Sequence, residues 1–340
     1  MKRRTLTPVI VLVATALGIT AAGCGSKPQP TAATLRVAHA ASAGGPRALV
    51  QFDQGVGAVT AGSSTPIWTD SDAVAALDGS AVFSVHHSSG DVLVRLDPDS
   101  GDVTSSWPLP PGTVSISAVA PTGRWVALTD RRPGYGAPQG RTSTELVVFD
   151  TKAGTESHRL HLDGDVQPEA FSVDGTLIFA LDYRGDHYRV QTILLATGER
   201  FDTSNRDKRV AREDMHGTSV RGVLNADHTL LATLYRNPGD ADEPAFVHIL
   251  DLVHGWAYCA DLPSPFGTGS PGTDLIELTP TDTVVVAATQ ASRIAEIHID
   301  QVHTPGNTPV TVDFRDGTIT SSGIDFASVP GFGHVISPLG

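Results

Sequence analysis

Short apolar runs separated by turn residues repeat along most of the chain. The runs are rich in Val, Ile, Leu and Thr, and Gly, Asp and Pro stand between them. This pattern is typical of β-strands joined by tight turns. No segment sustains the apolar spacing of an amphipathic helix. The pattern therefore predicts a single all-β domain over residues 46–340.

A first turn marker recurs directly before an apolar run. Gly and Asp in this marker suit the unusual backbone angles of tight turns. We expect it to join strands A and B, the first two strands of a four-stranded unit. The copies are Asp78-Gly79, Thr122-Gly123 and Asp174-Gly175, with weaker copies at Asp227, Asp282 and Pro330.

A second marker is an apolar strand that ends in Asp and is followed by Gly. The copies end at Asp53, Asp97, Asp150, Asp251 and Asp300, and the copy at Leu195 has lost its Asp. We expect this marker to join strands C and D. Successive copies lie roughly 45–55 residues apart, the length of one propeller blade. The markers predict a β-propeller of six blades, or of seven if residues 35–39 form a strand of another blade.

The order of the markers predicts how the two ends of the domain meet. The C–D marker at Asp53 precedes every A–B marker, and the A–B marker at Pro330 follows every C–D marker. The domain should therefore begin with half a blade and end with the other half. Pairing of the N- and C-terminal strands would close the ring and leave no free sheet edge.

Two of these turns carry a resemblance to known propellers. Residues 97–101 (Asp-Pro-Asp-Ser-Gly) and 150–154 (Asp-Thr-Lys-Ala-Gly) resemble the Asp-x-x-[Thr/Ser]-Gly turns of WD40-like, YVTN-type and quinoprotein-like propellers. The resemblance covers about residues 46–340 and implies the propeller fold. It does not imply the function of any member, because one fold hosts many functions. The Trp-Asp pair of eukaryotic WD40 repeats is absent from the sequence.

The first 23 residues have the three parts of an export signal. A basic start (Lys2, Arg3, Arg4) precedes an apolar run over residues 9–19. This run falls short of the roughly 20 apolar residues that a membrane span needs. The following Ala21-Ala22-Gly23-Cys24 resembles the lipobox of bacterial lipoproteins, although that family usually has Leu where Ala21 stands. The resemblance implies cleavage before Cys24 and attachment of acyl chains such as palmitate to this cysteine.

Residues 24–45 are expected to form a lipidated tether and linker. Pro28, Pro30 and polar neighbours are typical of a flexible segment. Two or more acyl chains anchor a protein stably where a single chain does not. We therefore expect a protein that is anchored to the cell membrane and faces outside the cytoplasm. The alternative is an ordinary cleaved signal or an uncleaved anchor, with Cys24 incidental.

Charge narrows the range of partners. The whole chain carries −13, and loss of three leader cations leaves 21 basic against 37 acidic residues, a net charge of −16. Nucleic acids and anionic lipid surfaces require basic patches, so neither is an expected partner. If Cys24 is lipidated, Cys259 has no disulfide partner, and we expect a buried, inert thiol. We expect the protein to be a monomer.

Acidic residues mark the predicted inner strands. Counting five residues back from each A–B turn gives one position on every strand A, which lines the central channel of a propeller. Carboxylates that face one another there would raise one another's pKa or bind a cation, for which oxygen ligands favour Ca²⁺ or Mg²⁺. The alternative is a hydrated channel with solvated carboxylates. The candidates are Glu169, Glu277 and Asp325, and the other blades have Ala73, Ser117 and Gly222 at this position.

Arg, Tyr and charged residues gather in the predicted B–C and D–A loops, which emerge on the same side of a propeller. Function concentrates in loops held by a rigid scaffold, and Tyr and Arg are enriched where proteins bind partners. Charged loops that only keep the protein soluble are the alternative. The candidates for a binding face are Arg131, Tyr135, Asp182, Arg184, His187, Tyr188, Tyr235 and Arg236.

Three functions are consistent with the sequence. A non-enzymatic binding or scaffold protein explains the tether, the loop face and the missing catalytic motifs, such as Gly-x-Ser-x-Gly and His-Glu-x-x-His. An exported lactonase or quinoprotein-type dehydrogenase would use the channel carboxylates with Ca²⁺ and His187 as a base. A metal-binding protein would use histidines, although His248, His254 and Cys259 lack a standard zinc spacing.

Overall fold

The computed structural model describes most of the chain after residue 45. The described residues are 46–52, 55–87, 90–109, 115–130, 140–205, 215–237, 239–269, 274–278, 283–299, 310–317 and 332–339. No helix in these ranges combines the length and the apolar character that a membrane crossing requires. Cys24 and the tether lie outside them, so lipidation stays a prediction.

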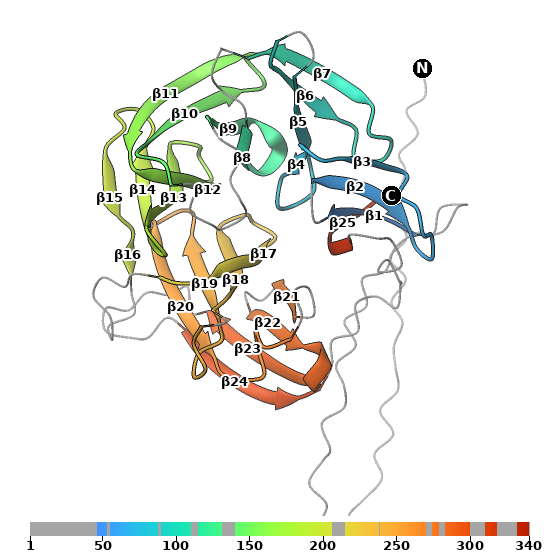
Figure 1. The fold of residues 1–340 in the computed structure, drawn as a ribbon, viewed down its shortest axis with the longest axis vertical. Coiled ribbons are helices and arrows are strands. Elements are labelled where there is room, and N and C mark those ends of the chain that lie inside the picture. Colours follow the sequence, from blue (N-terminus) through green and yellow to red (C-terminus); the bar gives the residue numbers. More distant parts are fainter. Residues whose placement is uncertain are drawn as a thin grey trace, which may run out of the picture. The chain divides into compact units, whose positions relative to one another are not determined.

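The described strands form six sheets (Figure 1). We number sheets 1 to 5 in chain order and call the sheet that contains strands from both ends of the domain sheet 6. Sheet 1 contains β4 (Val74–Ala75), β5 (Val82–His86), β6 (Val92–Leu96) and β7 (Val103–Pro108). Sheet 2 contains β8 (Ser115–Val119), β9 (Trp125–Thr129), β10 (Ser143–Asp150) and β11 (Thr155–Asp163). Sheet 3 contains β12 (Asp165–Phe171), β13 (Leu177–Arg184), β14 (His187–Leu194) and β15 (Arg200–Asp202).

Sheets 4 to 6 complete the described architecture. Sheet 4 contains β17 (Thr218–Leu224), β18 (Leu230–Arg236), β19 (Ala245–Asp251) and β20 (Trp256–Leu262), and the short β16 (Ser204–Asn205) pairs parallel to β20. Sheet 5 contains β21 (Asp274–Leu278), β22 (Thr283–Ala288), β23 (Arg293–Ile299) and β24 (Val310–Asp316). Sheet 6 contains β25 (Phe332–Leu339), β1 (Arg47–Phe52), β2 (Val56–Thr60) and β3 (Trp68–Asp70). Apart from β16, every described pairing is antiparallel, which is consistent with a β-propeller.

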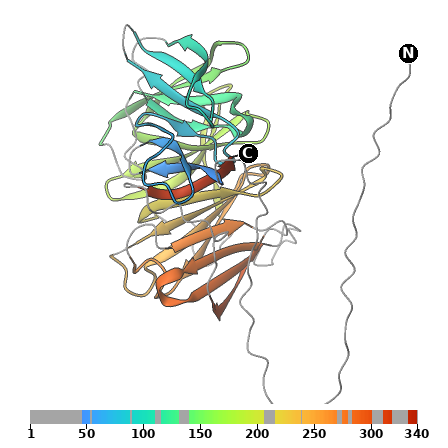
Figure 2. The same ribbon diagram turned by 90° about the vertical axis from the view of Figure 1, so that its right-hand side faces the viewer.

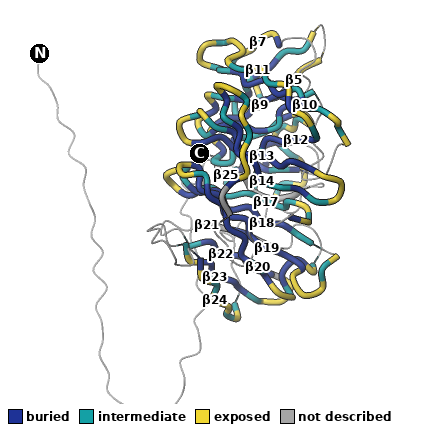
Figure 3. The backbone as a smooth tube through the Cα atoms, turned by 90° about the vertical axis from the view of Figure 1, so that its left-hand side faces the viewer, coloured by how far each residue is buried: buried dark blue, intermediate teal, exposed yellow. Residues whose placement is uncertain are grey.

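Alternate side chains of each strand face opposite neighbouring sheets. In β18, Leu231 belongs to a hydrophobic cluster shared with sheet 3, whereas Leu230 belongs to one shared with sheet 5. Because successive residues of a strand point to opposite faces, a strand between two other sheets needs apolar residues on both. This need explains the almost continuous apolar runs of the sequence. Figure 3 shows the buried strands in dark blue and many of the turns in yellow.

Sheet 6 joins the two ends of the domain. Strand β25 pairs with β1, with Arg47 opposite Leu339 and Phe52 opposite Phe332 (Figure 2, red beside blue). The expected pairing of N- and C-terminal strands is therefore present. The predicted sheet combines two strands from each end of the domain. The observed sheet instead combines one C-terminal strand, β25, with three N-terminal strands.

Packing against sheet 1 identifies β3 as the outer strand D of sheet 6. A Cβ added to Gly101, in the C–D turn of sheet 1, would lie 2.7 Å from the Trp68 ring of β3. Trp107 of β7, the strand D of sheet 1, lies in the same way against Gly154 in the C–D turn of sheet 2. The turn that contains Gly55 is therefore a B–C turn, not the predicted C–D turn. The prediction failed because Asp and Gly serve any tight β-turn and do not reveal its place in the sheet.

The two ends of the strands carry different connections. At one end, which we call the turn end, lie the A–B and C–D turns; His228 and Asp78, from the A–B turns of sheets 4 and 1, lie 3.4 Å apart. At the other end, the loop end, lie the B–C and D–A connections, where Arg141 bonds Asp165 at 2.9 Å. Arg47 forms an ion pair at 3.0 Å with Asp99, a residue of the C–D turn of sheet 1. Strand β1 therefore begins at the turn end.

Candidate functional site

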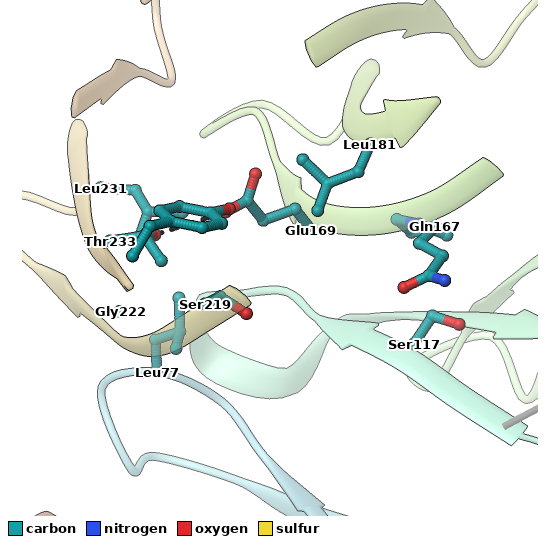
Figure 4. Close-up of a pocket in the computed structure, with 11 residues that line it drawn as sticks. Leu77, Ser117, Gln167, Glu169, Leu181, Ser219, Gly222, Leu231 and Thr233 are labelled. Carbon is teal, nitrogen blue, oxygen red and sulfur yellow. Dashed lines mark hydrogen bonds between the residues drawn. The ribbon is translucent and has the colours of Figure 1, made fainter. Parts of the chain in front are cut away.

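A pocket of about 110 Å³ is lined by the first strand of sheet 2 and by the first two strands of sheets 3 and 4 (Figure 4). Leu77, from the A–B turn of sheet 1, contributes to its wall at the turn end. The described lining residues include one acidic side chain, several neutral polar groups and four apolar side chains. They are Leu77, Ser117, Gln167, Pro168, Glu169, Leu181, Ser219, Gly222, Leu231, Thr233 and Tyr235.

A β-bulge places Glu169 in this pocket. The register of β12 against β13 shifts between Pro168 and Ala170, so Glu169 has no partner in the ladder. A bulge bends a strand and re-aims the side chain of its extra residue, and bulges are frequent beside functional sites. β8 has the same shift at Ser117, the position that the turn count aligned with Glu169. Local backbone irregularity therefore marks this position in two neighbouring sheets.

The Glu169 carboxylate has one satisfied and one unsatisfied oxygen. Oε1 accepts hydrogen bonds from the Tyr235 hydroxyl at 3.0 Å and from the Thr233 hydroxyl at 3.3 Å. Oε2 is buried and accepts no hydrogen bond from the described part of the protein. Burial raises the pKa of Glu169, and it outweighs the two hydrogen bonds, which act to lower this pKa. Figure 4 shows the side chain directed toward Thr233 and Leu231.

Buried aromatic side chains hold Tyr235 in place. The Tyr235 ring stacks on Phe246 at 5.0 Å between centroids, and Tyr188 lies against it at 5.8 Å. Tyr183 continues the group, with its ring 5.3 Å from that of Tyr188. Burial raises the pKa of all three tyrosines, so they remain neutral hydroxyls across the physiological range. This aromatic cluster therefore holds in place the Tyr235 hydroxyl that donates to Glu169.

The structure brings together three positions of the predicted channel. Ser117, Glu169 and Gly222 line the same pocket. Glu277 lies in β21, whose side chain at this position is outside the described part, and Asp325 falls outside the described residues. The turn from which Asp325 was counted also precedes β25, the first described strand of its sheet rather than the second. A shared Ca²⁺ or Mg²⁺ site therefore stays a prediction.

Other candidate metal ligands are not gathered in the described residues. No group of three or more His, Cys, Asp or Glu there is arranged to hold a metal ion. His248 lies directly opposite Cys259 in the β19–β20 pair, and His254 bonds Asp251 at 3.0 Å. Cys259 is buried, as the sequence predicted, and forms no disulfide with another described residue.

Part of the predicted binding face lies at the loop end of sheet 3. Arg184 and His187 flank the tight hairpin between β13 and β14. Arg184 is exposed and bonds Asp182 at 3.0 Å, while His187 lies 5.8 Å from the His216 ring. Asp182 is itself buried and also pairs with Arg200 at 3.2 Å. Arg131 and Tyr135 fall outside the described residues.

Tyr188, Tyr235 and Arg236 lie in strands, not in the predicted loops. Both tyrosines are fully buried, and Arg236 donates from Nε to the Gly267 carbonyl at 2.9 Å. The prediction ended the apolar runs at the last aliphatic residue, but β13 and β18 continue through Tyr183 and Tyr235. An aromatic ring between two sheets is as favourable as an aliphatic side chain, so composition did not show where the strands end.

Comparisons with known proteins give limited guidance. No family model matches the chain. No curated protein matches it significantly. Similar solved structures include the β-propeller domain of Cps50 (Swd1) from Myceliophteria thermophila, 13% identical with a TM-score of 0.41, covering 71% of this chain and 68% of that chain. A putative 6-phosphogluconolactonase from Bacteroides uniformis is 14% identical with a TM-score of 0.44, covering 82% and 85%.

TolB from Acinetobacter baumannii is 15% identical to this chain with a TM-score of 0.40. The similarity covers 75% of this chain and 61% of that TolB, so this chain spans about three fifths of its length. Likeness at such low TM-scores carries no argument about activity. The propeller interpretation therefore rests on the sheets and their order in this chain.

Proposed function

We propose that this protein is a lipid-anchored β-propeller outside the cytoplasm that binds a partner through its loop end. The observation that supports this best is the end of the sheets at which β1, the first described strand, begins. Arg47 lies at the turn end, paired with Asp99 at 3.0 Å, whereas the Arg184–His187 hairpin lies at the loop end. A chain anchored through Cys24 would therefore present the loop end on the side opposite its attachment.

The length of the tether suits this arrangement. A flexible segment over residues 24–45 would have an average end-to-end distance of roughly 25 Å. That distance gives the propeller room to turn while keeping it close to the membrane. The anchor thus sets position, and the loop end is free to meet a protein or small-molecule partner. This is the binding role that function-bearing loops on a rigid scaffold commonly serve.

Six blades in a closed ring form part of the same proposal. Hydrophobic clusters are shared between sheets 6 and 1, 1 and 2, 2 and 3, 3 and 4, and 4 and 5. The far face of sheet 6 buries Ala48, Val50, Phe52 and Val59, and the far face of sheet 5 buries Val285, Ala287 and Ile294. Packing of these two apolar faces on each other would close the ring.

The pocket supports binding over catalysis. Its only ionisable lining groups, among the residues described, are Glu169 and Tyr235, and they bond each other. A catalytic acid or base needs access to the reacting atom and a nucleophile or second proton carrier in reach. His187, the base considered for an enzyme, lies at the loop end and does not line this pocket.

The anchoring part of the proposal is tested by Cys24→Ala. In a bacterium that processes lipoproteins, wild-type protein should sediment with membranes and remain there in high salt, because acyl chains rather than charge hold it. Cys24→Ala should lose the acyl chains, measured by labelling with a fatty-acid analogue and by mass spectrometry. Cys259→Ala is the matched control and should keep both label and location. Acyl label that persists in Cys24→Ala, or its absence from wild type, would refute the anchor.

A further inference from the structure

We propose that the Glu169 pocket is a binding site for a small organic cation, namely the protonated amino group of an aliphatic amine. This site is separate from the loop-end face and does not depend on the lipid anchor. Three features of the pocket support it: an unsatisfied acidic oxygen, a lining whose one charged group is acidic among the described residues, and an apolar wall.

The first feature is the unsatisfied oxygen of Glu169. Glu169 Oε2 is buried without a donor from the described residues, while Oε1 already accepts from Tyr235 and Thr233. A buried acceptor left without a donor is unfavourable, and the cost is larger for a charged group. A ligand N–H group placed at Oε2 would satisfy this oxygen. The two hydroxyl donors at Oε1 hold the carboxylate in the orientation that receives it.

The charge of the lining selects a cation over a neutral or acidic ligand. No Lys, Arg or His is among the described residues that line the pocket. Among the described residues, the hydroxyls of Tyr235, Tyr188 and Tyr183 lie close enough to interact with Glu169, and burial keeps them neutral. An ammonium group would therefore be the partner of a lone carboxylate in an environment of low polarity. Opposite charges at close range attract strongly in such an environment.

The wall of the pocket selects an aliphatic body. Leu77, Leu181, Leu231 and Pro168 line it together with Glu169. Small-molecule sites typically combine such an apolar wall with a few polar groups that fix orientation. A volume of about 110 Å³ suits an amine of a few carbon atoms. The site therefore takes the end of an amine whose charged head meets Glu169 and whose carbon chain contacts the leucines.

The test is titration of the purified mature protein with n-butylammonium by calorimetry, with 1-butanol as its neutral isostere. A small ligand of this size is expected to bind in about the millimolar range. Butylammonium should bind at least about tenfold more tightly than butanol, and Glu169→Gln should remove this preference. Glu156→Gln, which removes a carboxylate that does not line the pocket, should keep it. Circular dichroism and thermal unfolding establish that both variants are folded.

Proton release provides a readout that a merely structural Glu169 would not give. Because burial raises the pKa of Glu169, its carboxyl group keeps a proton to higher pH than an ordinary glutamate does, and an ammonium ion bound at Oε2 would expel that proton. Titration in two buffers of different ionisation enthalpy should show proton release with butylammonium and none with butanol. Affinity should fall as the pH decreases. Equal binding of the two probes, no binding of either, or an unchanged preference in Glu169→Gln would each overturn the proposal.

Discussion

Replacing Asp165 by Ala is expected to lower the free energy of unfolding by about 3–5 kcal/mol. Asp165 and Arg141 form an ion pair at 2.9 Å in which each side chain is only 4% exposed. Asp165 also accepts a hydrogen bond from the Gly140 amide at 2.8 Å. The variant would leave the Arg141 guanidinium buried with a weaker partner, Asp130, at 3.1 Å. A buried charge that loses its buried partner is far more costly than the loss of an exposed pair.

The matched control is Glu156→Ala. Glu156 pairs with Arg159 at 2.7 Å, but the two side chains are 31% and 38% exposed. Water screens such a pair, so the expected loss is at most about 1 kcal/mol. Urea unfolding measures both variants, and unchanged slopes of the transition would show that midpoints can be compared. Equal losses in the two variants would contradict the account of a pair that ties sheet 2 to sheet 3.

The second large effect is a loss of stability in mild acid caused by His248. Burial lowers the pKa of His248 from its ordinary value of 6.5 to about 4. Between these values the unfolded chain binds a proton that the folded protein does not. The contribution of His248 to the free energy of unfolding is therefore fully present above about pH 6.5. It is lost as the pH decreases toward about 4, by roughly 3 kcal/mol in total.

His248→Phe removes this titration while keeping a ring beside Tyr235, from which His248 lies 6.3 Å away. Its unfolding free energy should fall less steeply than that of wild type between about pH 6.5 and about pH 4.5. Glu169 acts in the opposite direction, because its raised pKa makes the folded protein bind a proton first. Glu169 is present in both proteins, so the difference in slope isolates His248. Parallel slopes in urea unfolding would show that His248 is not buried in neutral form.

The repeat of turn markers predicted most of the fold. Asp78-Gly79, Thr122-Gly123 and Asp174-Gly175 do separate first and second strands, because each of these sheets needs the same tight turn there. The division of sheet 6 could not be predicted in this way. It depends on which strand pairs with β25, a contact between residues at opposite ends of the domain. The strand order and the packing of Trp68 on Gly101 distinguish the two arrangements.

The candidate site likewise combines residues that the sequence pattern predicts with partners that only tertiary packing brings near. Glu169 was predicted from its place before a turn, and the pocket contains it with Ser117 and Gly222. Its hydrogen-bond donors, Tyr235 and Thr233, lie more than sixty residues away in the sequence. The sequence predicts Tyr235 for the binding face and predicts no role for Thr233. The Arg141–Asp165 pair is likewise formed between sheets. Such partners follow from tertiary packing, which sequence spacing does not encode.

The central claim is that the loop end, opposite the tether, meets the partner. The most direct measurement is photo-crosslinking in intact cells from a photoreactive amino acid at Asp186, in the loop-end hairpin of sheet 3, or at Lys152, in the C–D turn of sheet 2. Both positions are exposed, with the Asp186 side chain 91% accessible. The account predicts a discrete crosslinked species from position 186, lost on adding Arg184→Glu, and none from position 152. The same species from position 152 alone, or no discrete species from position 186, would contradict it.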